Sequence, residues 1–109
     1  MTNNTIDNVL IALADPTRRS IVEILSDGQA RSVSEITRHF GMTRQAVTKH
    51  LTVLIDGGIL VSERHGRDRY NRLRPEGFDP LRQWFTHYSA FWDDRLSALK
   101  LQVEQELKS

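Results

Sequence analysis

The sequence contains no cysteine among its 109 residues, and this absence removes several kinds of chemistry. Disulfide bonds, thiolate metal sites and cysteine nucleophiles are excluded, and the composition suits a reducing cytoplasm, where we expect the protein to act. No apolar run approaches the ~18 residues that span a bilayer, so we expect no membrane segment. The first ten residues, MTNNTIDNVL, lack a basic segment before a long apolar stretch, so we expect no signal peptide.

Residue patterns typical of enzymes are also scarce. No nucleophile–base pair, glycine-rich phosphate loop or constellation of carboxylates stands out, so we expect no catalytic residues and no cofactor. The four histidines are scattered without metal-ligand spacing, at positions 39, 50, 65 and 87. His87 and Asp94 lie ~10 Å apart along one helix and cannot share an ion within one chain, which leaves only a pairing between subunits open. We therefore predict no metal site.

Positive charge is concentrated in one part of the chain. The length favours a single domain, residues 1–109, and a charged fraction of 27% is ordinary for a soluble globular protein. Residues 31–74 hold nine basic and four acidic residues, a local charge of +5, whereas the remainder holds six basic and ten acidic residues. Attraction to phosphate groups depends on local charge of this kind, so residues 31–74 are the candidate region for binding a polyanion.

Apolar residues at helical spacing predict four short helices in the first half of the chain. They cover roughly residues 5–14, 16–25, 32–40 and 44–56, with Asp15, either Ser32 or Ser34, and Thr43 as N-caps. Ser32 is followed three residues later by Glu35, as in a capping box. Gly41 is expected to supply a turn conformation that residues with a Cβ resist. The last two helices and their tight turn predict a helix-turn-helix at about 32–57.

A β-hairpin is predicted directly after this motif. Two β-like runs, residues 59–65 and 69–73, flank the loop Gly66-Arg67-Asp68. A helix-turn-helix followed by a hairpin at about 59–73 is a winged helix, a mainly α fold with a small β wing. The second helix of such a motif enters the major groove of DNA, so the expected partner is double-stranded DNA.

The polar side of the fourth predicted helix supplies candidate contacts to DNA. Gln45 and Arg44 lie in its first turn, where glutamine can bond adenine and arginine can bond guanine. Thr48 and Lys49 lie one turn later. Thr48 suits a thymine methyl group or a phosphate, and Lys49 suits a phosphate. For His50, a packed or backbone-bonded role and a phosphate contact are equally open. The predicted DNA-binding residues are Thr43, Arg44, Gln45, Thr48, Lys49, His50, Arg64, Arg67 and Arg69.

A long C-terminal helix, about 80–107, is predicted as one helix or two nearly collinear ones, with Asp79 as its N-cap and Pro80 at its start. It would be ~40 Å long, which is more than the diameter of so small a domain. Its apolar stripe needs a cover, and a second copy of the chain is the simplest one, although a fold-back over its own core stays open. The aromatic residues also leave a small-molecule pocket open. The predicted dimer interface comprises Ile6, Leu10, Leu13, Trp84, Tyr88, Phe91, Trp92, Leu96, Leu99 and Val103.

Taken together, the segments ALADPTRRSIVEIL and SVSEITRHFGMTRQAVTKHLTVLIDGGILVSERHGRDRYNRL closely resemble the ArsR family of winged-helix repressors. The resemblance covers about residues 11–73, and the terminal helices extend it across nearly the whole chain. It implies a homodimeric transcriptional repressor that occupies an imperfect palindromic operator and is usually released by an inducer. Many members sense metals through cysteines before the recognition helix. Residues 33–38, VSEITR, have none, so the resemblance is to a branch without that motif, and its inducer is unknown.

Three other functions compete with this interpretation. The same DNA-binding dimer could carry a metal or small-molecule inducer site between its terminal helices. A protein-interaction module on a winged-helix scaffold is a further possibility, although the basic wing argues against it. An enzyme is the weakest alternative, for the reasons given above.

Overall fold

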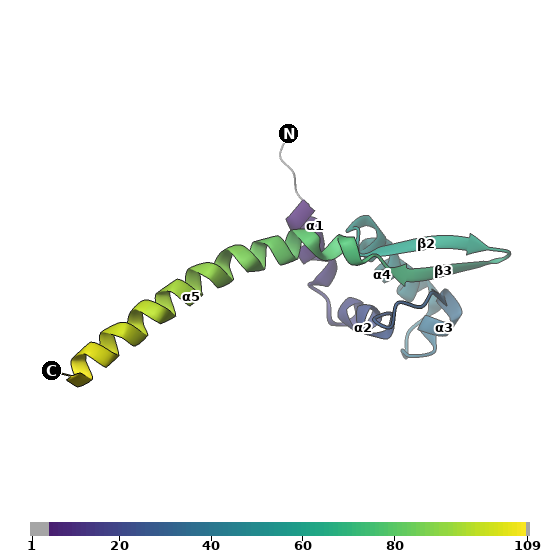
Figure 1. Cartoon of the computed structure of the whole chain (residues 1–109). Coiled ribbons are helices and arrows are strands. Elements are labelled where there is room, and N and C mark those ends of the chain that lie inside the picture. Colours follow the sequence, from purple (N-terminus) through teal and green to yellow (C-terminus); the bar gives the residue numbers. More distant parts are fainter. Residues whose placement is uncertain (1–4, 109) are drawn as a thin grey trace.

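The computed structural model describes residues 5–108 and shows a helical body with a β wing on one side and a long helix on the other (Figure 1). Over these residues, none of the helices is both long and apolar enough to cross a lipid bilayer. The elements are α1 (Thr5–Leu13), α2 (Pro16–Ile24), β1 (Arg31–Ser32), α3 (Val33–Thr37), α4 (Arg44–Asp56), β2 (Leu60–His65), β3 (Asp68–Leu73), the 3-10 helix η1 (Pro75–Phe78) and α5 (Asp79–Lys108).

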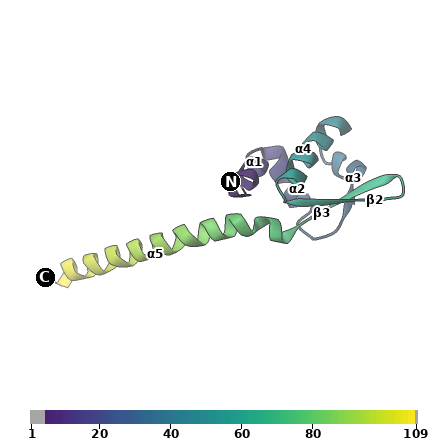
Figure 2. The same cartoon turned by 90° about the horizontal axis from the view of Figure 1, so that it is seen from above.

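The hydrophobic core lies where the first four helices meet the base of the wing (Figure 2). Helical periodicity places one apolar face of each helix inward, and burying these side chains stabilises the body by roughly 1.5–3 kcal/mol for each large one. Ile21, Ile36 and Leu54 are fully buried and represent α2, α3 and α4. The buried apolar residues are Val9, Ala12, Ile21, Leu25, Val33, Ile36, Val47, Leu51, Leu54, Ile59 and Leu60.

Three predicted N-caps are confirmed. The carboxylate of Asp15 accepts a hydrogen bond from the backbone N–H of Arg18 at 3.1 Å. Of the two serines considered for α3, Ser32 is the cap, and it forms the complete capping box with Glu35. The hydroxyl of Thr43 accepts from the backbone N–H of Ala46 at 3.1 Å. Each cap satisfies a helix-end donor that would otherwise lack a partner.

The region between α2 and α4 differs from the prediction in three respects. Helix α3 ends at Thr37, whereas the apolar spacing predicted a helix to about residue 40. Residues 38–40 form turns and a bend instead. Residues 31–32 form a short strand, β1, because Arg31 pairs with Asn71 across the sheet. Gly41 does not adopt a positive φ, so the prediction that it supplies a turn conformation unfavourable to other residues was wrong. No Cβ clash would arise at this position either.

The wing is an antiparallel sheet of strand order β1-β3-β2. Its turn is shorter than predicted, because Asp68 already pairs with His65 and only residues 66–67 remain between the strands. Gly66 has a φ of +65°, which a two-residue hairpin turn with glycine at its first position requires.

The C-terminal helix α5 is a single helix of 30 residues, which decides between the two predicted alternatives. It follows η1 without a break, so Asp79 is its first residue rather than the predicted cap. None of its residues is buried in the single chain. Because α5 projects from the body (Figure 1), the radius of gyration is 19.8 Å, whereas a compact domain of this length has about 13 Å.

Candidate nucleic-acid interface

Helix α4 buries one face in the core and presents its opposite face to solvent. Val47, Leu51 and Leu54 hold the buried side. Arg44, Gln45, Thr48 and Lys49 are all exposed and together line a shallow concave surface. This polar surface contains two residue types that read bases and one that favours phosphate, as a recognition helix requires.

Arg44 is partly engaged within the protein. Its guanidinium donates a hydrogen bond to the hydroxyl of Ser34 in α3 at 3.3 Å. This contact joins the two helices of the helix-turn-helix and leaves the other guanidinium donors of Arg44 available. Gln45 makes no such bond to α3, so it is the less constrained of the two side chains in the first turn of α4.

His50 lies on the flank of α4 that faces the α1–α2 corner, away from the wing. Its Nδ1 is 3.3 Å from Nη1 of Arg18 and 3.8 Å from Oδ2 of Asp15. The backbone N–H of Arg18 lowers the pKa of Asp15, and nearby His50 adds to this effect. Within residues 5–108, the structure shows no backbone bond to the ring of His50, which was one of the roles that the sequence left open, but a contact with the side chain of Arg18. The predicted phosphate contact of His50 stays a prediction.

The two faces of the wing differ in charge. Side chains alternate along each strand, and the register pairs Arg64 with Arg69 and Ser62 with Asn71. These four side chains therefore share one face, which we call the inner face because Ser62, Arg69 and Asn71 line a groove against α4. No acidic residue occupies the inner face between Leu60 and Leu73.

The groove between α4 and the inner face has a volume of about 400 Å³. Thr48 and Thr52 contribute from α4, and Arg69 contributes from β3. The guanidinium of Arg69 donates to the hydroxyl of Ser62 at 3.0 Å, which holds the positive charge beside the groove. Hydroxyl and guanidinium donors without a nearby carboxylate form an environment suited to a phosphate group.

The outer face of the wing is electrostatically mixed. Arg72 lies 3.6 Å from a carboxylate oxygen of Glu63, and His65 lies 3.6 Å from the other oxygen. The ring of Tyr70 packs edge-on against His65. The positive charge of Arg72, which is not among the predicted DNA-binding residues, is thus partly neutralised.

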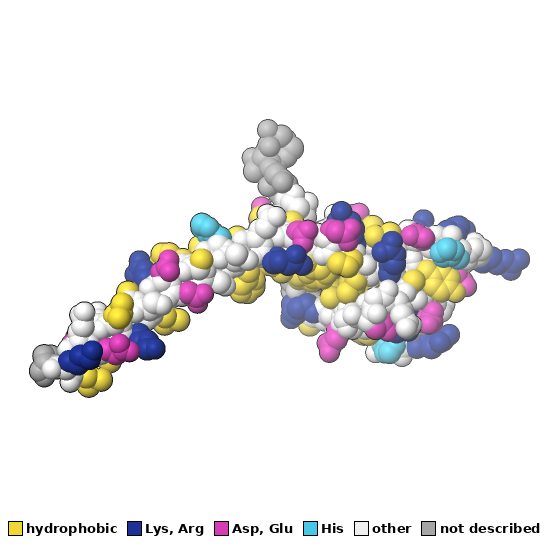
Figure 3. All heavy atoms as spheres, in the orientation of Figure 1, with side chains coloured by type: hydrophobic (Ala, Val, Ile, Leu, Met, Phe, Trp, Pro, Cys, Tyr) yellow, Lys and Arg dark blue, Asp and Glu magenta, His cyan; other side chains and the backbone are white. Residues whose placement is uncertain are grey.

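The predicted DNA-binding residues lie on α4 and its cap and on the wing. Arg67 is exposed in the turn at the far end of the wing, where basic side chains gather (Figure 3). Arg64 and Arg69 lie on the inner face, and the remaining members belong to α4 or cap it. Sequence reasoning missed Ser62, whose small side chain gives no signal of its own. Only the register reveals that it holds Arg69.

Hydrophobic side chains lie exposed along α5 (Figure 3), and the predicted dimer residues of this helix are among them. Trp92, Leu96 and Leu99 each leave more than half of their surface exposed. In α1, Leu10 is exposed, whereas Ile6 and Leu13 are partly buried, and Leu13 packs against the core. Phe85, Leu101 and Leu107 are also exposed on α5 but were not among the predicted interface residues.

Comparison with known proteins agrees with this geometry. Residues 13–63 match the family described as "Helix-turn-helix domain". An HTH-type transcriptional regulator of Mycobacterium tuberculosis is 35% identical over 100 residues, which cover 92% of this chain and 90% of the relative. The transcriptional repressor SdpR of Bacillus subtilis is 27% identical over 82 residues, or 75% of this chain and 90% of the relative.

A solved structure shows the same arrangement of elements. The crystal structure of an ArsR family transcriptional regulator superposes with a TM-score of 0.77 at 30% identity and covers 85% of this chain and 95% of its own. The fold therefore matches that of the solved structure, and the alignments cover nearly the whole length of the two relatives and of that structure. The chain belongs to the ArsR family of winged helix-turn-helix transcriptional regulators.

Proposed function

We propose that this protein is a homodimeric, sequence-specific DNA-binding repressor that acts by occupying its operator. The observation that supports this most strongly is the exposed polar face of α4 beside the acid-free inner face of the wing. Together they present base-reading groups next to phosphate-binding groups on one side of the body. Repression in particular is suggested by the relative SdpR, which is named a transcriptional repressor.

The proposed dimer explains the uncovered helix α5. A helix of 30 residues with a row of exposed aromatic and aliphatic side chains is costly to leave in water. A two-fold pairing through α5 and α1 covers this surface in both copies at once. It also presents two recognition helices to one duplex, about one helical turn apart, so the operator is an imperfect palindrome.

We assign base reading to Gln45 and Arg44. Phosphate contact is assigned to Lys49, Arg67 and Arg69. Thr43 and Thr48 support the first turn of α4 against the DNA backbone. The protein would act in the cytoplasm, where operator DNA lies in bacteria such as those of the relatives, and it would need no catalytic residue. Within residues 5–108, no three histidine or acidic side chains gather as a metal ligand set.

Selection of bound sequences from random duplexes tests the proposal most directly. We expect enrichment of two related half-sites in inverted orientation, and an affinity that falls steeply with salt. Gln45→Ala should relax base preference at one position per half-site, at a cost of about 1–3 kcal/mol against the preferred base. Enrichment of no sequence, with no mobility shift on any duplex in dilute buffer, would refute DNA binding.

A further inference from the structure

Helix α1 occupies a position between the long helix α5 and the recognition helix α4, and it contacts both (Figure 2). In the proposed dimer, α1 and α5 belong to the interface, whereas α4 belongs to the DNA-binding surface. The contacts between α1 and α4 therefore determine how the recognition helix is held relative to the dimer axis.

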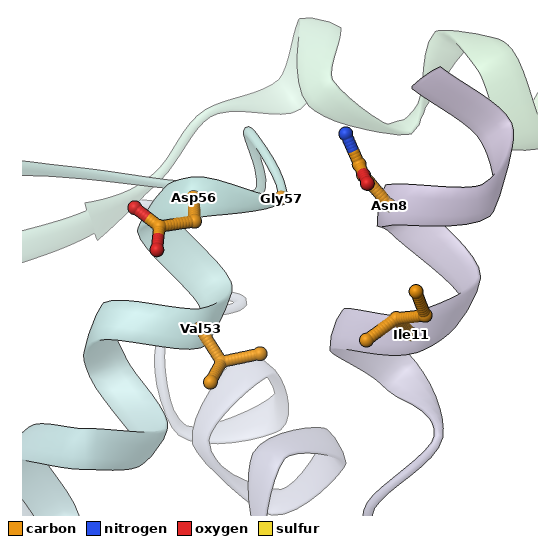
Figure 4. Close-up of a pocket in the computed structure, with 5 residues that line it drawn as sticks. All are labelled: Asn8, Ile11, Val53, Asp56 and Gly57. Carbon is orange, nitrogen blue, oxygen red and sulfur yellow. The ribbon is translucent and has the colours of Figure 1, made fainter. Parts of the chain in front are cut away.

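The first of these contacts lies at the C-terminal end of α4. A Cβ added to Gly57 would lie 2.8 Å from the Cβ of Ala12 and 3.1 Å from the backbone oxygen of Asn8. The two backbones therefore approach each other closely here. Beside this contact, Ile11 and Val53 line a groove of about 220 Å³ between the two helices (Figure 4).

The second contact lies beyond the groove and is made by Arg18. Its Nε donates to the backbone oxygen of Ala12 at 2.8 Å, and its Nη2 donates to that of Ile11 at 3.0 Å. Its Nη1 reaches Nδ1 of His50 in α4 at 3.3 Å. Arginine has no acceptor, so Nδ1 of His50 accepts this bond. One guanidinium thus joins the end of α1 to the middle of α4.

The two contacts are seven residues apart on α4, which corresponds to about 10 Å along its axis. Two separated points define the direction of an axis, whereas one point leaves it free to tilt. Core packing holds one side of α4. On the side that faces α1, the groove beside Val53 leaves fewer packed side chains to oppose a tilt of the helix. The bond between Arg18 and His50 opposes that tilt.

We propose that Arg18 and His50 are positioning residues that fix the direction of α4 relative to α1 and so set the half-site spacing that the dimer accepts. The inference rests on the proposed dimeric DNA binding. In a two-fold dimer, any tilt of α4 occurs in both copies and changes the separation of the two recognition helices. Base reading by Gln45 depends on the side chain itself and not on this separation.

The test measures affinity for duplexes that carry the selected half-sites with the spacer lengthened or shortened by one or two base pairs. The parent should strongly prefer one spacing. Arg18→Gln should keep the preferred half-site sequence but reduce the preference for that spacing by about tenfold, the effect of one hydrogen bond to a charged group. Arg19→Gln is the matched control, because Nη1 of Arg19 donates to the backbone oxygen of Leu13 at 2.7 Å, at the same helix end.

A pair of His50 variants separates this role from simple stabilisation of α1. His50→Leu removes the acceptor and leaves the bonds from Arg18 to α1 in place, so it should flatten the spacing profile even if Arg18→Gln fails to fold. His50→Asn keeps an acceptor near the position of Nδ1 and should restore the parent profile. Circular dichroism and thermal unfolding verify that each variant is folded.

Two results would overturn the inference, and they differ from failure of the proposed function. A folded His50→Leu protein with the parent spacing profile would show that the bond does not position α4. An equal loss of affinity at every spacing in both His50 variants would show a phosphate contact instead. A parent protein that binds no duplex would refute the proposed function itself, and this inference with it.

Discussion

The side chains of Arg69 and Arg72 are three positions apart on β3 and therefore point to opposite faces of the wing. Arg69 lines the groove against α4 and is held by Ser62. Arg72 lies on the outer face beside the carboxylate of Glu63. Two exposed arginines of one strand thus occupy different electrostatic environments, which permits a paired experiment at the scale of single residues.

We expect Arg69→Ala to weaken binding to all duplexes by a similar factor, since a phosphate contact carries no base information. The slope of log affinity against log salt should fall by about one, because one fewer counterion is released. Arg72→Ala, as the matched control, should leave both quantities nearly unchanged. Equal losses in the two variants, measured by fluorescence anisotropy over a salt series, would contradict the assignment of the inner face.

Glu35 supplies a second residue-scale property, the dependence of stability on pH. Its carboxylate accepts the backbone N–H of Ser32 at 3.0 Å, and this bond, with a further one from the Ser32 side chain, lowers the pKa of Glu35. A group whose pKa is lowered by folding stabilises the protein above its ordinary pKa, and that contribution is lost as the pH falls through the folded value.

We therefore expect Glu35→Gln to change the acid limb of the stability curve. Glutamine keeps an acceptor for the capping box, so the free energy of unfolding at pH 7 should fall only modestly. Below about pH 4.5, the parent should lose stability more steeply than the variant. Urea unfolding at a series of pH values measures both curves, and parallel curves would show that Glu35 does not contribute to acid sensitivity.

At the scale of elements, η1 joins the wing to α5 through an unusually close backbone contact. A Cβ added to Gly77 would lie 1.9 Å from the backbone oxygen of Gly58 and 3.2 Å from the Cα of Ile59. Only glycine fits here without displacing backbone. The contact fixes where α5 leaves the body, at the base of the wing and next to the end of α4.

Gly77→Ala should therefore destabilise the protein by about 1–3 kcal/mol or more, because the added Cβ would have to displace the backbone at Gly58 and Ile59. Gly41→Ala is the matched control, since no atom lies within 4 Å of an added Cβ and the backbone φ is not positive. That variant should be neutral or slightly stabilising. Thermal unfolding measures both, and equal melting temperatures for the two variants would contradict the close contact at Gly77.

At the scale of the whole molecule, the proposed dimer depends on which side of α5 the second copy covers. Leu99 and Leu101 leave 56% and 59% of their surfaces exposed, yet they point to nearly opposite sides of α5, since residues two apart on a helix differ by about 200°. Leu99 belongs to the row that includes Tyr88 and Val103. Leu101 lies outside that row.

We expect Leu99→Glu to weaken the dimer by at least about tenfold, because each interface would bury two unpaired charges. Leu101→Glu places the same charge on the other side of the helix and should leave the dimer intact. Sedimentation equilibrium over a concentration series distinguishes monomer from dimer. A dimer that survives Leu99→Glu, or that dissociates in both variants, would place the interface elsewhere.

Much of the fold could be predicted from the sequence, although some details could not. The bounds of α1, α2 and α4 follow from caps and apolar spacing, which act within a few residues. Strand β1 was not predicted, since two residues carry no periodic signal and gain their structure from Asn71 across the sheet. The end of α3 was misplaced because apolar spacing continues to Phe40 while the backbone already turns.

The candidate site divides in the same way between local and long-range information. The sequence by itself determined that α4 has a polar face and that the wing bears arginines, because both properties depend on the order of neighbouring residues. Only the tertiary structure decided that Arg69 and not Arg72 faces α4, and that Arg18 meets His50 from 32 positions away. Such contacts depend on strand register and helix packing. Both result from burying the whole core and cannot be deduced from any short segment of the sequence.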